Sequence, residues 1–210
     1  MIRRFNNKIF SLLDILIIKY QILKSTFFSK ISLKFQHCIY GKNFRTSGKC
    51  FFKANNSKSI IFGDRVSLFS AHRTNRIGLT NPTLIQTLDN GKIYIGNDSG
   101  LSSVVISSRA KIKIGDRVKI GANTKILDHD FHSLSKEYRS SCDDNKYIKS
   151  KPIIIKNDVF IGVNSIILKG VEIGNGVIIG AGSVVTMNKI PSNVIVAGNP
   201  AKIVKKVNYG

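Results

Sequence analysis

The sequence predicts a mainly-β protein built from stacked, repeating coils, and three observations support this prediction. First, aliphatic residues recur at a constant step of six in the C-terminal part of the chain, at Ile155, Ile161, Ile167, Ile173, Ile179 and Val185. Second, three of these residues are followed directly by glycine, and five have a small or β-branched residue four places later. Third, the same step occurs earlier in the chain, at Ile114, Ile120 and Ile126.

A step of six residues matches neither an α-helix, which repeats about every 3.6 residues, nor a simple strand, which alternates every two. It matches a short strand and a tight corner that repeat together, with glycine or asparagine in the turns. Stacked coils of this kind bury a continuous column of aliphatic side chains. Segments 62–68 and 95–101 look like weaker coils. Where the step slips, at 73–91 and 101–114, we expect irregular or loop-bearing coils.

Residues 1–38 form a basic and apolar segment that we expect to be helical. Polar residues within it recur near helical spacing and leave a wide apolar face. Asp14, Lys19 and Lys24 punctuate the apolar run and no small-residue cleavage site follows it, which disfavours a membrane span and a signal peptide. Two roles stay open for residues 1–35: peripheral contact with the inner face of a membrane, or packing on the protein's own domain or a neighbouring subunit.

The composition narrows the class of protein. The 210 residues include 33 Lys and Arg against 12 Asp and Glu, a formal net charge of +21, yet 42% are hydrophobic, which excludes a disordered basic tail. The charge suggests an anionic partner, but no motif interleaves aromatic and basic residues, so we expect no nucleic acid. Cys38, Cys50 and Cys142 have the spacing of neither a disulfide framework nor a zinc site, which favours a reducing compartment.

Residues 128–152 interrupt the repeat, which stops after Ile126 and resumes at Ile153. An excursion of this length within a regular solenoid is typical of a functional or disordered segment. The segment 120–134, IGANTKILDHDFHSL, resembles the active-site loop of the galactoside, maltose, xenobiotic and capsule-sugar O-acetyltransferases. The resemblance implies a left-handed parallel β-helix of hexapeptide repeats over residues 39–207, with a protruding active-site loop and a tail at 208–210. It also implies a homotrimer whose sites form between subunits.

In that family a histidine of this loop is the general base, and position matches it to His132, with His129 as the fallback base. Acetyl transfer from a thioester to a sugar hydroxyl requires a proton to leave an alcohol of very high pKa, and imidazole titrates near neutral pH. No covalent acyl-enzyme is required, so no nucleophilic cysteine or serine is expected. Asp130 is a candidate to orient the imidazole, and Asp128 and Glu137 stay open for the same role.

Two later segments, 180–186 and 197–202, resemble the C-terminal segments of these acetyltransferases, which hold acetyl-CoA in a groove between neighbouring β-helices. The resemblance assigns contacts with the acetyl-CoA donor to Gly162, Ala181, Ser183, Thr186, Lys189, Lys202 and Lys205. The charge of the C-terminal segment fits this assignment, because residues 186–210 contain four lysines and no acidic residue, and the CoA phosphates are anionic. The family's Thr-Lys-Asp-Ile-Pro segment is one residue longer here, so Lys189 is an indirect match.

For the acceptor, the resemblance implies Ser102 and Ser103, which match a family segment near the acceptor. It also implies Phe160, which stands where many relatives have tryptophan. The β-helix is similar, in addition, to that of the γ-class carbonic anhydrases, which bind zinc through three histidines from adjacent coils and neighbouring subunits. Here His129 and His132 share one loop and no histidine follows them, so no metal is expected.

Together these observations predict a cytoplasmic O-acetyltransferase that moves acetyl from acetyl-CoA to a sugar hydroxyl in capsule, lipopolysaccharide or other cell-surface glycan synthesis. Three alternatives stay open: an amino-sugar N-acetyltransferase, an antibiotic-inactivating acetyltransferase and a non-catalytic β-helix scaffold. The presence of His132 and of the donor segments disfavours the scaffold. The basic apolar N-terminal segment favours a membrane-proximal glycan over a small soluble drug.

Overall fold

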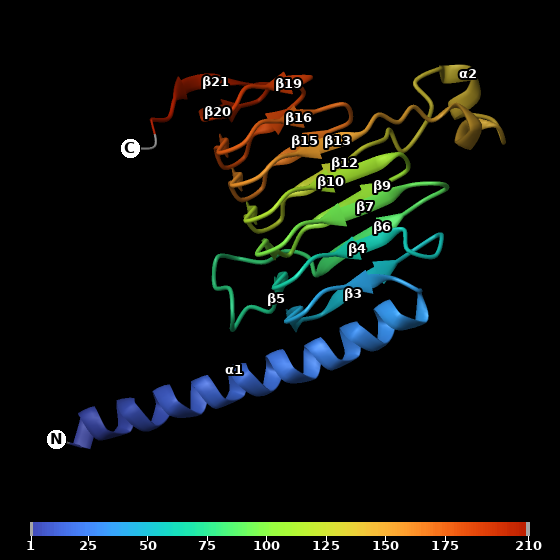
Figure 1. The fold of residues 1–210 in the computed structure, drawn as a ribbon. Helices are drawn as coiled ribbons and strands as arrows, with labels where there is room; N and C mark the ends of the chain where they lie inside the picture. Colours follow the sequence, from blue (N-terminus) through green and yellow to red (C-terminus); the bar gives the residue numbers. More distant parts are fainter. Residues whose placement is uncertain (1, 209–210) are drawn as a thin grey trace.

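The computed structural model describes residues 2–208, with side chains from residue 12 onward. The chain begins with one long helix, α1 (Ile2–Phe35), and then winds around a common axis in short strands (Figure 1). Each of the first six turns of the winding contributes one strand to each of three sheets, called A, B and C below.

The three sheets contain the following strands. Sheet A is made of β1 (Ile39–Tyr40), β4 (Ile60–Phe62), β7 (Lys92–Ile95), β10 (Lys111–Ile114), β13 (Ile153–Ile155), β16 (Glu172–Ile173) and β19 (Lys189–Ile190). Sheet B is made of β2 (Arg45–Gly48), β5 (Ser67–Ser70), β8 (Gly100–Ser102), β11 (Lys119–Ile120), β14 (Phe160–Ile161), β17 (Ile178–Ile179), β20 (Val194–Gly198) and β21 (Ala201–Lys206). Sheet C is made of β3 (Cys50–Lys53), β6 (Thr83–Thr87), β9 (Val105–Ser108), β12 (Lys125–Leu127), β15 (Ile166–Leu168) and β18 (Val184–Val185).

Strands within each sheet pair in parallel, except that β21 folds back antiparallel on β20 at the C-terminal end. The chain is a left-handed parallel β-helix preceded by one long helix, which confirms the predicted fold class. The aliphatic residues of the six-residue step fill its centre. Ile114 pairs with Ile155 and Ile120 with Ile161, and all four side chains are at most 2% exposed. Successive turns therefore bury one continuous column.

The edge between sheets A and B carries a ladder of side-chain hydrogen bonds. In successive turns one side-chain oxygen accepts a backbone N–H from the preceding turn at 2.7–3.0 Å; the acceptors are Asp64, Asn97, Asp116, Asn157, Asn175 and Ser192. Glycine precedes four of these acceptors in the sequence, and a Cβ on any of the four would lie 2.4–2.6 Å from an atom of the next turn. The recurring glycine and Asn or Asp thus allow the turns to stack closely.

One expectation about the irregular coils is wrong. Residues 101–114 form regular strands, and Leu101 still pairs with Ile120 and Ile106 with Ile126. The six-residue step slips there for two reasons: the corner between Leu101 and Ile106 is one residue shorter than the equivalent corner in the next turn, and the segment from Ile106 to Ile114 is two residues longer than the equivalent segment from Ile167 to Ile173. The other stretch, 73–91, does carry a loop, which spans residues 71–82 between β5 and β6.

The C-terminal half of α1 closes the first turn of the β-helix (Figure 1). Strand β2 lies at the edge of sheet B, where backbone groups lack a neighbouring strand. Thr26 Oγ1 donates to the carbonyl oxygen of Thr46 (3.2 Å) and accepts from its backbone N–H (2.9 Å), and Ser25 Oγ accepts from the N–H of Gly48 (3.0 Å). Leu33 is fully buried in the core. Polar residues of the helix therefore satisfy the open edge, while Leu33 extends the apolar column.

The N-terminal half of α1 extends past the side of the β-helix (Figure 1). It presents the exposed apolar side chains of Leu12, Leu13 and Leu16, and those of Tyr20 and Leu23 follow just past its end; these five side chains are 49–71% exposed. Asp14 forms ion pairs with Arg73 and Arg76 and so links this overhanging half to the loop at 71–82. Within residues 2–208, no helix combines the length and the apolar character needed to cross a membrane.

Candidate active site

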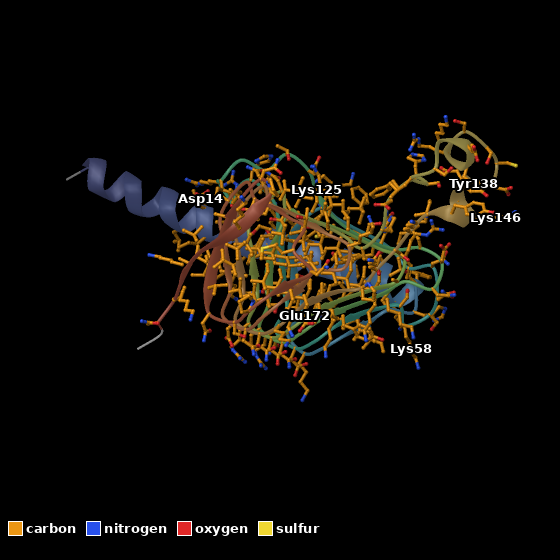
Figure 2. All side chains as sticks on the ribbon, turned by 90° about the horizontal axis from the view of Figure 1, so that it is seen from above. Asp14, Lys58, Lys125, Tyr138, Lys146 and Glu172 are labelled. Carbon is orange, nitrogen blue, oxygen red and sulfur yellow. The ribbon has the colours of Figure 1, made fainter. Side chains whose placement is uncertain are left out.

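The loop 128–152 leaves the β-helix at the edge between sheets C and A and contains α2 (Lys136–Arg139) and a 3₁₀ turn, η1 (Asp144–Tyr147). Figure 2 shows it projecting outward, with Tyr138 and Lys146 at its far end. A buried carboxylate anchors its start. Asp128 is fully buried and accepts hydrogen bonds from Ser108 Oγ (2.6 Å) and from the backbone N–H groups of Arg109 (2.7 Å) and Ala110 (3.0 Å). These donors offset the cost of burying the carboxylate.

Contacts within the loop hold α2 and η1 together. The rings of Tyr138 and Tyr147 stack with their centroids 3.5 Å apart and their planes 12° from parallel. A side-chain hydrogen bond between Tyr147 and Tyr138 raises the pKa of Tyr147 above its ordinary value. A guanidinium nitrogen of Arg139 donates to the carbonyl oxygen of Ser133 at 3.1 Å, which ties α2 to the segment that carries His132. The position of His132 is thus set by the folding of the loop itself.

His132 lies on the surface of this loop, with its side chain 68% exposed and its Nδ1 2.6 Å from Oδ2 of Asp144. The other carboxylate oxygen of Asp144 accepts the backbone N–H of Ser133 at 2.6 Å. The bond from Ser133, and then that from His132, hold the pKa of Asp144 below its ordinary range. An ionised carboxylate at Nδ1 favours the tautomer that carries its proton there. Nε2 is then left with a lone pair that can accept a proton.

His129, the alternative base, is buried and only 5% exposed. Its Nδ1 lies 3.1 Å from Oδ1 of Asp128, and its ring packs against Phe131 with the centroids 4.7 Å apart. Its Nε2 has no hydrogen-bond partner among the described residues. His129 therefore belongs to the buried anchor of the loop, whereas the side chain of His132 is open to solvent.

The carboxylate beside His132 differs from those expected from the sequence. Asp130 forms an ion pair with Lys169 at 2.5 Å, and Glu137 is exposed on α2. Asp144 takes the position instead, although it is twelve residues from His132. Sequence reasoning misses Asp144 because no repeat or motif links the two residues; the stacked tyrosines and η1 bring them together.

Three predicted donor-site residues lie on the edge between sheets B and C. Gly162 follows β14, and Ala181 and Ser183 follow β17 in the next turn. A Cβ on Gly162 would lie 2.5 Å from the backbone nitrogen of Ala181, so glycine permits the two turns to approach closely. Ser183 is fully buried and donates to the carbonyl oxygen of Gly180 at 2.6 Å. Ala181 is the exposed member of this group, and Ser183 stabilises the corner beneath it.

The remaining predicted donor residues are exposed. Lys202 and Lys205 lie on β21, and Lys202 pairs with Ala197, whose Cβ packs on the same edge between sheets B and C. Thr186 follows β18, and Lys189 lies on β19 of sheet A. Lys202 therefore lies in sheet B two strands from β17, which precedes Ala181, whereas Thr186 and Lys189 lie towards the opposite side of sheet C.

Two of the predicted acceptor residues share the outer face of sheet B. Ser102 on β8 and Phe160 on β14 line a shallow hollow of about 290 Å³, and Phe160 is 49% exposed. Ser103 is buried at the next corner with a positive φ of 45°, and its Oγ has no hydrogen-bond partner among the described residues. Ser103 is therefore inaccessible to a ligand on that face.

Within one chain, the predicted base lies on a different side of the β-helix from the predicted acceptor residues. The loop that carries His132 projects from the edge between sheets C and A, whereas Ser102 and Phe160 face outward from sheet B, which lies opposite that edge. Within residues 2–208, no three His, Cys, Asp or Glu side chains gather closely enough to hold a metal ion.

Comparison with known proteins shows the family. A family model described as bacterial transferase hexapeptide (six repeats) matches residues 152–186. WbbJ of Escherichia coli K12, assigned as a lipopolysaccharide biosynthesis O-acetyl transferase, is 32% identical over 165 residues, which cover 76% of this chain and 77% of WbbJ. The chain belongs to the hexapeptide-repeat acyltransferases. The predicted family and the predicted enzyme class are thereby confirmed.

Further similarities of this hexapeptide-repeat acyltransferase are more local or concern the fold. A 2,3,4,5-tetrahydropyridine-2,6-dicarboxylate N-acetyltransferase of Clostridium perfringens is 54% identical, but only over 57 residues, 27% of this chain and 24% of that protein. Among solved structures, AntD, an N-acyltransferase from Bacillus cereus, superposes with a TM-score of 0.67 at 24% identity, covering 85% of this chain and 88% of AntD. NeuO, described as a polySia-specific acetyltransferase, has a TM-score of 0.54 at 23% identity, covering 82% and 77%. Both structures share the β-helical fold.

Proposed function

We propose that this hexapeptide-repeat acyltransferase moves acetyl from acetyl-CoA to a hydroxyl of a sugar, in the synthesis of lipopolysaccharide or a related cell-surface glycan. The observation that carries the proposal is the exposed pair of His132 and Asp144, 2.6 Å apart, on the loop that interrupts the β-helix. The identity of 32% to WbbJ over most of both chains supports the sugar as the acceptor class.

The geometry suits direct transfer. Nε2 of His132 takes the proton of the sugar hydroxyl while the hydroxyl oxygen attacks the thioester carbonyl. The tetrahedral intermediate collapses, the bond from carbon to sulfur breaks, and the leaving CoA thiolate takes the proton from the imidazolium. Asp144 stabilises the imidazolium between these two events, and its carboxylate keeps the proton of the ring on Nδ1. A general base in this position contributes a rate factor of about 10²–10⁴.

The donor lies along the edge between sheets B and C in this proposal. The close stacking of Gly162 on Ala181 brings the two turns together, and Ala181 is exposed at this corner, where its backbone can bond the amide groups of the pantetheine arm. Lys202 and Lys205 on β21 are exposed and suit the CoA phosphates. Thr186 and Lys189 lie farther away and would meet a donor bound by a neighbouring copy.

A homotrimer completes this arrangement. Because the loop with His132 projects away from sheet B of its own chain, it can serve an acceptor on sheet B only in a neighbouring copy. Three copies with cyclic symmetry give each sheet B one neighbouring loop. Each site then takes its base from one copy and Ser102 and Phe160 from the next.

We also propose that the overhanging half of α1 contacts the inner face of a membrane, which places the enzyme in the cytoplasm beside lipid-borne glycans. The exposed Leu12, Leu16 and Leu23 supply apolar surface, and Lys19 and Lys24 on the same helix suit anionic lipid headgroups. Packing of this half against another subunit is the alternative, and the two are separated by experiment in the Discussion.

The reaction is tested by incubating the purified protein with acetyl-CoA and deacetylated lipopolysaccharide oligosaccharide, followed by mass spectrometry of the glycan. We expect acetyl on the glycan that hydroxylamine releases, because hydroxylamine cleaves an ester and leaves an amide intact. Acetyl that resists hydroxylamine would instead identify an amino-sugar N-acetyltransferase, the alternative favoured by the local similarity to the Clostridium perfringens enzyme. Glycan left unmodified would contradict the proposal.

A further inference from the structure

A basic hollow lies between α1, from Lys19 to Lys30, and the outer face of sheet B. It encloses about 890 Å³, and residues from α1, β2, β5, β8 and β11 or their adjoining turns line it. Five of its lining side chains are cationic, namely Lys19, Lys30, Arg45, Arg65 and Lys119. Its single carboxylate, Asp98, is already held by Arg65 through two hydrogen bonds of 2.6 and 2.8 Å.

Four cations of this hollow therefore lack a carboxylate partner among the described side chains. The Nε of Arg45 donates to Ser67 Oγ at 2.8 Å, and Nζ of Lys119 donates to the carbonyl oxygen of Asp98 at 2.9 Å. Lys19 on α1 and Lys30 complete the group. Cations that converge from a helix and a sheet onto one concave surface attract a ligand with several negative charges. A diphosphate offers such charges within the span of a single small group.

This basic hollow is continuous with the smaller hollow that Ser102 and Phe160 line. Arg45, Ser67 and Lys119 line both. The smaller hollow also contains Gly121, and a Cβ on Gly121 would lie 2.9 Å from the carbonyl carbon of Gly162. The combined groove thus runs along the axis of the β-helix, from a cationic end at α1 to an end with a hydroxyl and aromatic rings beside the edge proposed for the donor.

Because one end of the groove is cationic and the other carries a hydroxyl and aromatic rings, we infer that the groove binds a glycosyl diphosphate. The diphosphate would lie at the basic end and the sugar on Ser102 and Phe160. The inference rests on the proposed function and deepens it, since it assigns the acceptor to the class of diphosphate-linked sugars. Sugars present hydroxyls and apolar C–H faces, which suit a serine beside an exposed aromatic ring. The sugar then lies next to the acetyl donor, while the charged group stays at a distance.

Two kinds of ligand contain a glycosyl diphosphate: a soluble nucleoside-diphosphate sugar and a polyprenyl-diphosphate sugar in a membrane. Ile22 and Leu23 line the basic end of the groove, and Leu23 is 71% exposed. An isoprenoid chain bound to the diphosphate would lie against them and continue along the apolar overhang of α1. Leu23→Ser therefore distinguishes the two sources, because it removes apolar contact and leaves the cations in place.

The test measures binding to the full-length protein by calorimetry, with CoA at saturation so that the donor site is occupied. The probes are inorganic pyrophosphate, UDP-N-acetylglucosamine and farnesyl-diphosphate N-acetylglucosamine in detergent. For all three we expect the Kd to rise by about tenfold or more when Lys19→Glu is combined with Lys30→Glu, because both lysines line only the basic end of the groove. The matched control is Lys125→Glu, an exposed lysine on sheet C that lines neither hollow, and it should leave each Kd unchanged.

The outcomes separate this inference from the proposed function. If Leu23→Ser weakens only the farnesyl probe, the ligand is lipid-linked; if it weakens none, the ligand is a soluble diphosphate sugar, and either result supports the groove. Equal binding of pyrophosphate by the native chain and the double variant, or its loss on addition of CoA, would overturn the inference. Acetylation of a neutral oligosaccharide that continues in the double variant would then leave the proposed function standing.

Discussion

Asp144 Oδ2 lies 2.6 Å from Nδ1 of His132, and the same carboxylate accepts the backbone N–H of Ser133. One side chain therefore fixes both the imidazole and the main chain next to it. The pair sits on a loop that the β-helix presents outward, with Nε2 of His132 directed away from the carboxylate. In the proposed mechanism Asp144 is a positioning residue, because it would act on the acceptor only through His132.

Replacement of Asp144 by Asn should lower kcat by about tenfold or more and leave the KM for acetyl-CoA unchanged. An Asn oxygen can still accept the N–H of Ser133, so the loop keeps its shape while the charge opposite the imidazolium is lost. Asp144→Glu should recover part of kcat. Asp143→Asn is the matched control, since the neighbouring Asp143 is paired with Lys146, and its kcat should equal that of the native chain. Equal kcat values for all four proteins would remove Asp144 from the mechanism.

The outcome for this loop illustrates what can be predicted from the sequence. The coils could be predicted because every turn repeats the same requirement: an aliphatic residue inside and glycine with Asn or Asp at a crowded corner. The loop has no such repetition. Its fold depends on pairs such as Tyr138 with Tyr147 and Asp144 with His132, each of which occurs once. A contact that occurs only once produces no repeating pattern in a sequence, so the carboxylate partner of His132 could not be predicted. His132 itself could be, because it lies in a segment that resembles a known active-site loop.

The donor proposal predicts that Lys202→Glu raises the KM for acetyl-CoA by about tenfold and changes the KM for the glycan much less. The reason is that Lys202 lies on the exposed strand β21 next to the edge where the phosphates of CoA would bind. Lys113→Glu on sheet A serves as the control for the added negative charge. Steady-state kinetics with each substrate varied in turn provide the measurement. A larger rise in the KM for the glycan would place the donor elsewhere.

The ion pairs on the edge between sheets A and B predict a loss of stability in acid. Arg65 lowers the pKa of Asp98, and Arg117 lowers that of Asp158. A carboxyl whose pKa is lower in the folded state stabilises the protein above its unfolded pKa, about 3.9, and that contribution disappears as the pH falls through the folded pKa. We therefore expect the variant with Asp98→Asn and Asp158→Asn to have a lower Tm than the native chain near neutral pH.

The same two proteins should have equal Tm values at a pH below the folded pKa of both carboxyls. Added salt of about 1 M should reduce the difference near neutral pH, because both pairs are exposed to solvent. Calorimetric scans across this pH range provide the measurement. A Tm difference that stays constant with pH would show that the two side chains act through contacts other than their charge.

The overhang of α1 predicts binding to anionic vesicles. Leu12→Glu with Leu16→Glu should abolish co-sedimentation with vesicles that contain phosphatidylglycerol, because both side chains are more than half exposed and the change places charge on the apolar surface. Ile77→Glu, at an exposed apolar residue of the loop 71–82, is the control. Size-exclusion chromatography separates the alternative role. A variant that still binds vesicles but dissociates into single chains would show that the overhang packs between subunits.

His132 provides the most direct test of the account. In the purified protein, with acetyl-CoA and a glycan acceptor, His132→Ala should lower kcat by about 10²–10⁴-fold while the Kd for CoA and the oligomeric state stay those of the native chain. His72→Ala, at an exposed histidine outside the loop, should retain full activity. If His132→Ala transfers acetyl at the native rate, the general base is not His132, and the account of this site is contradicted.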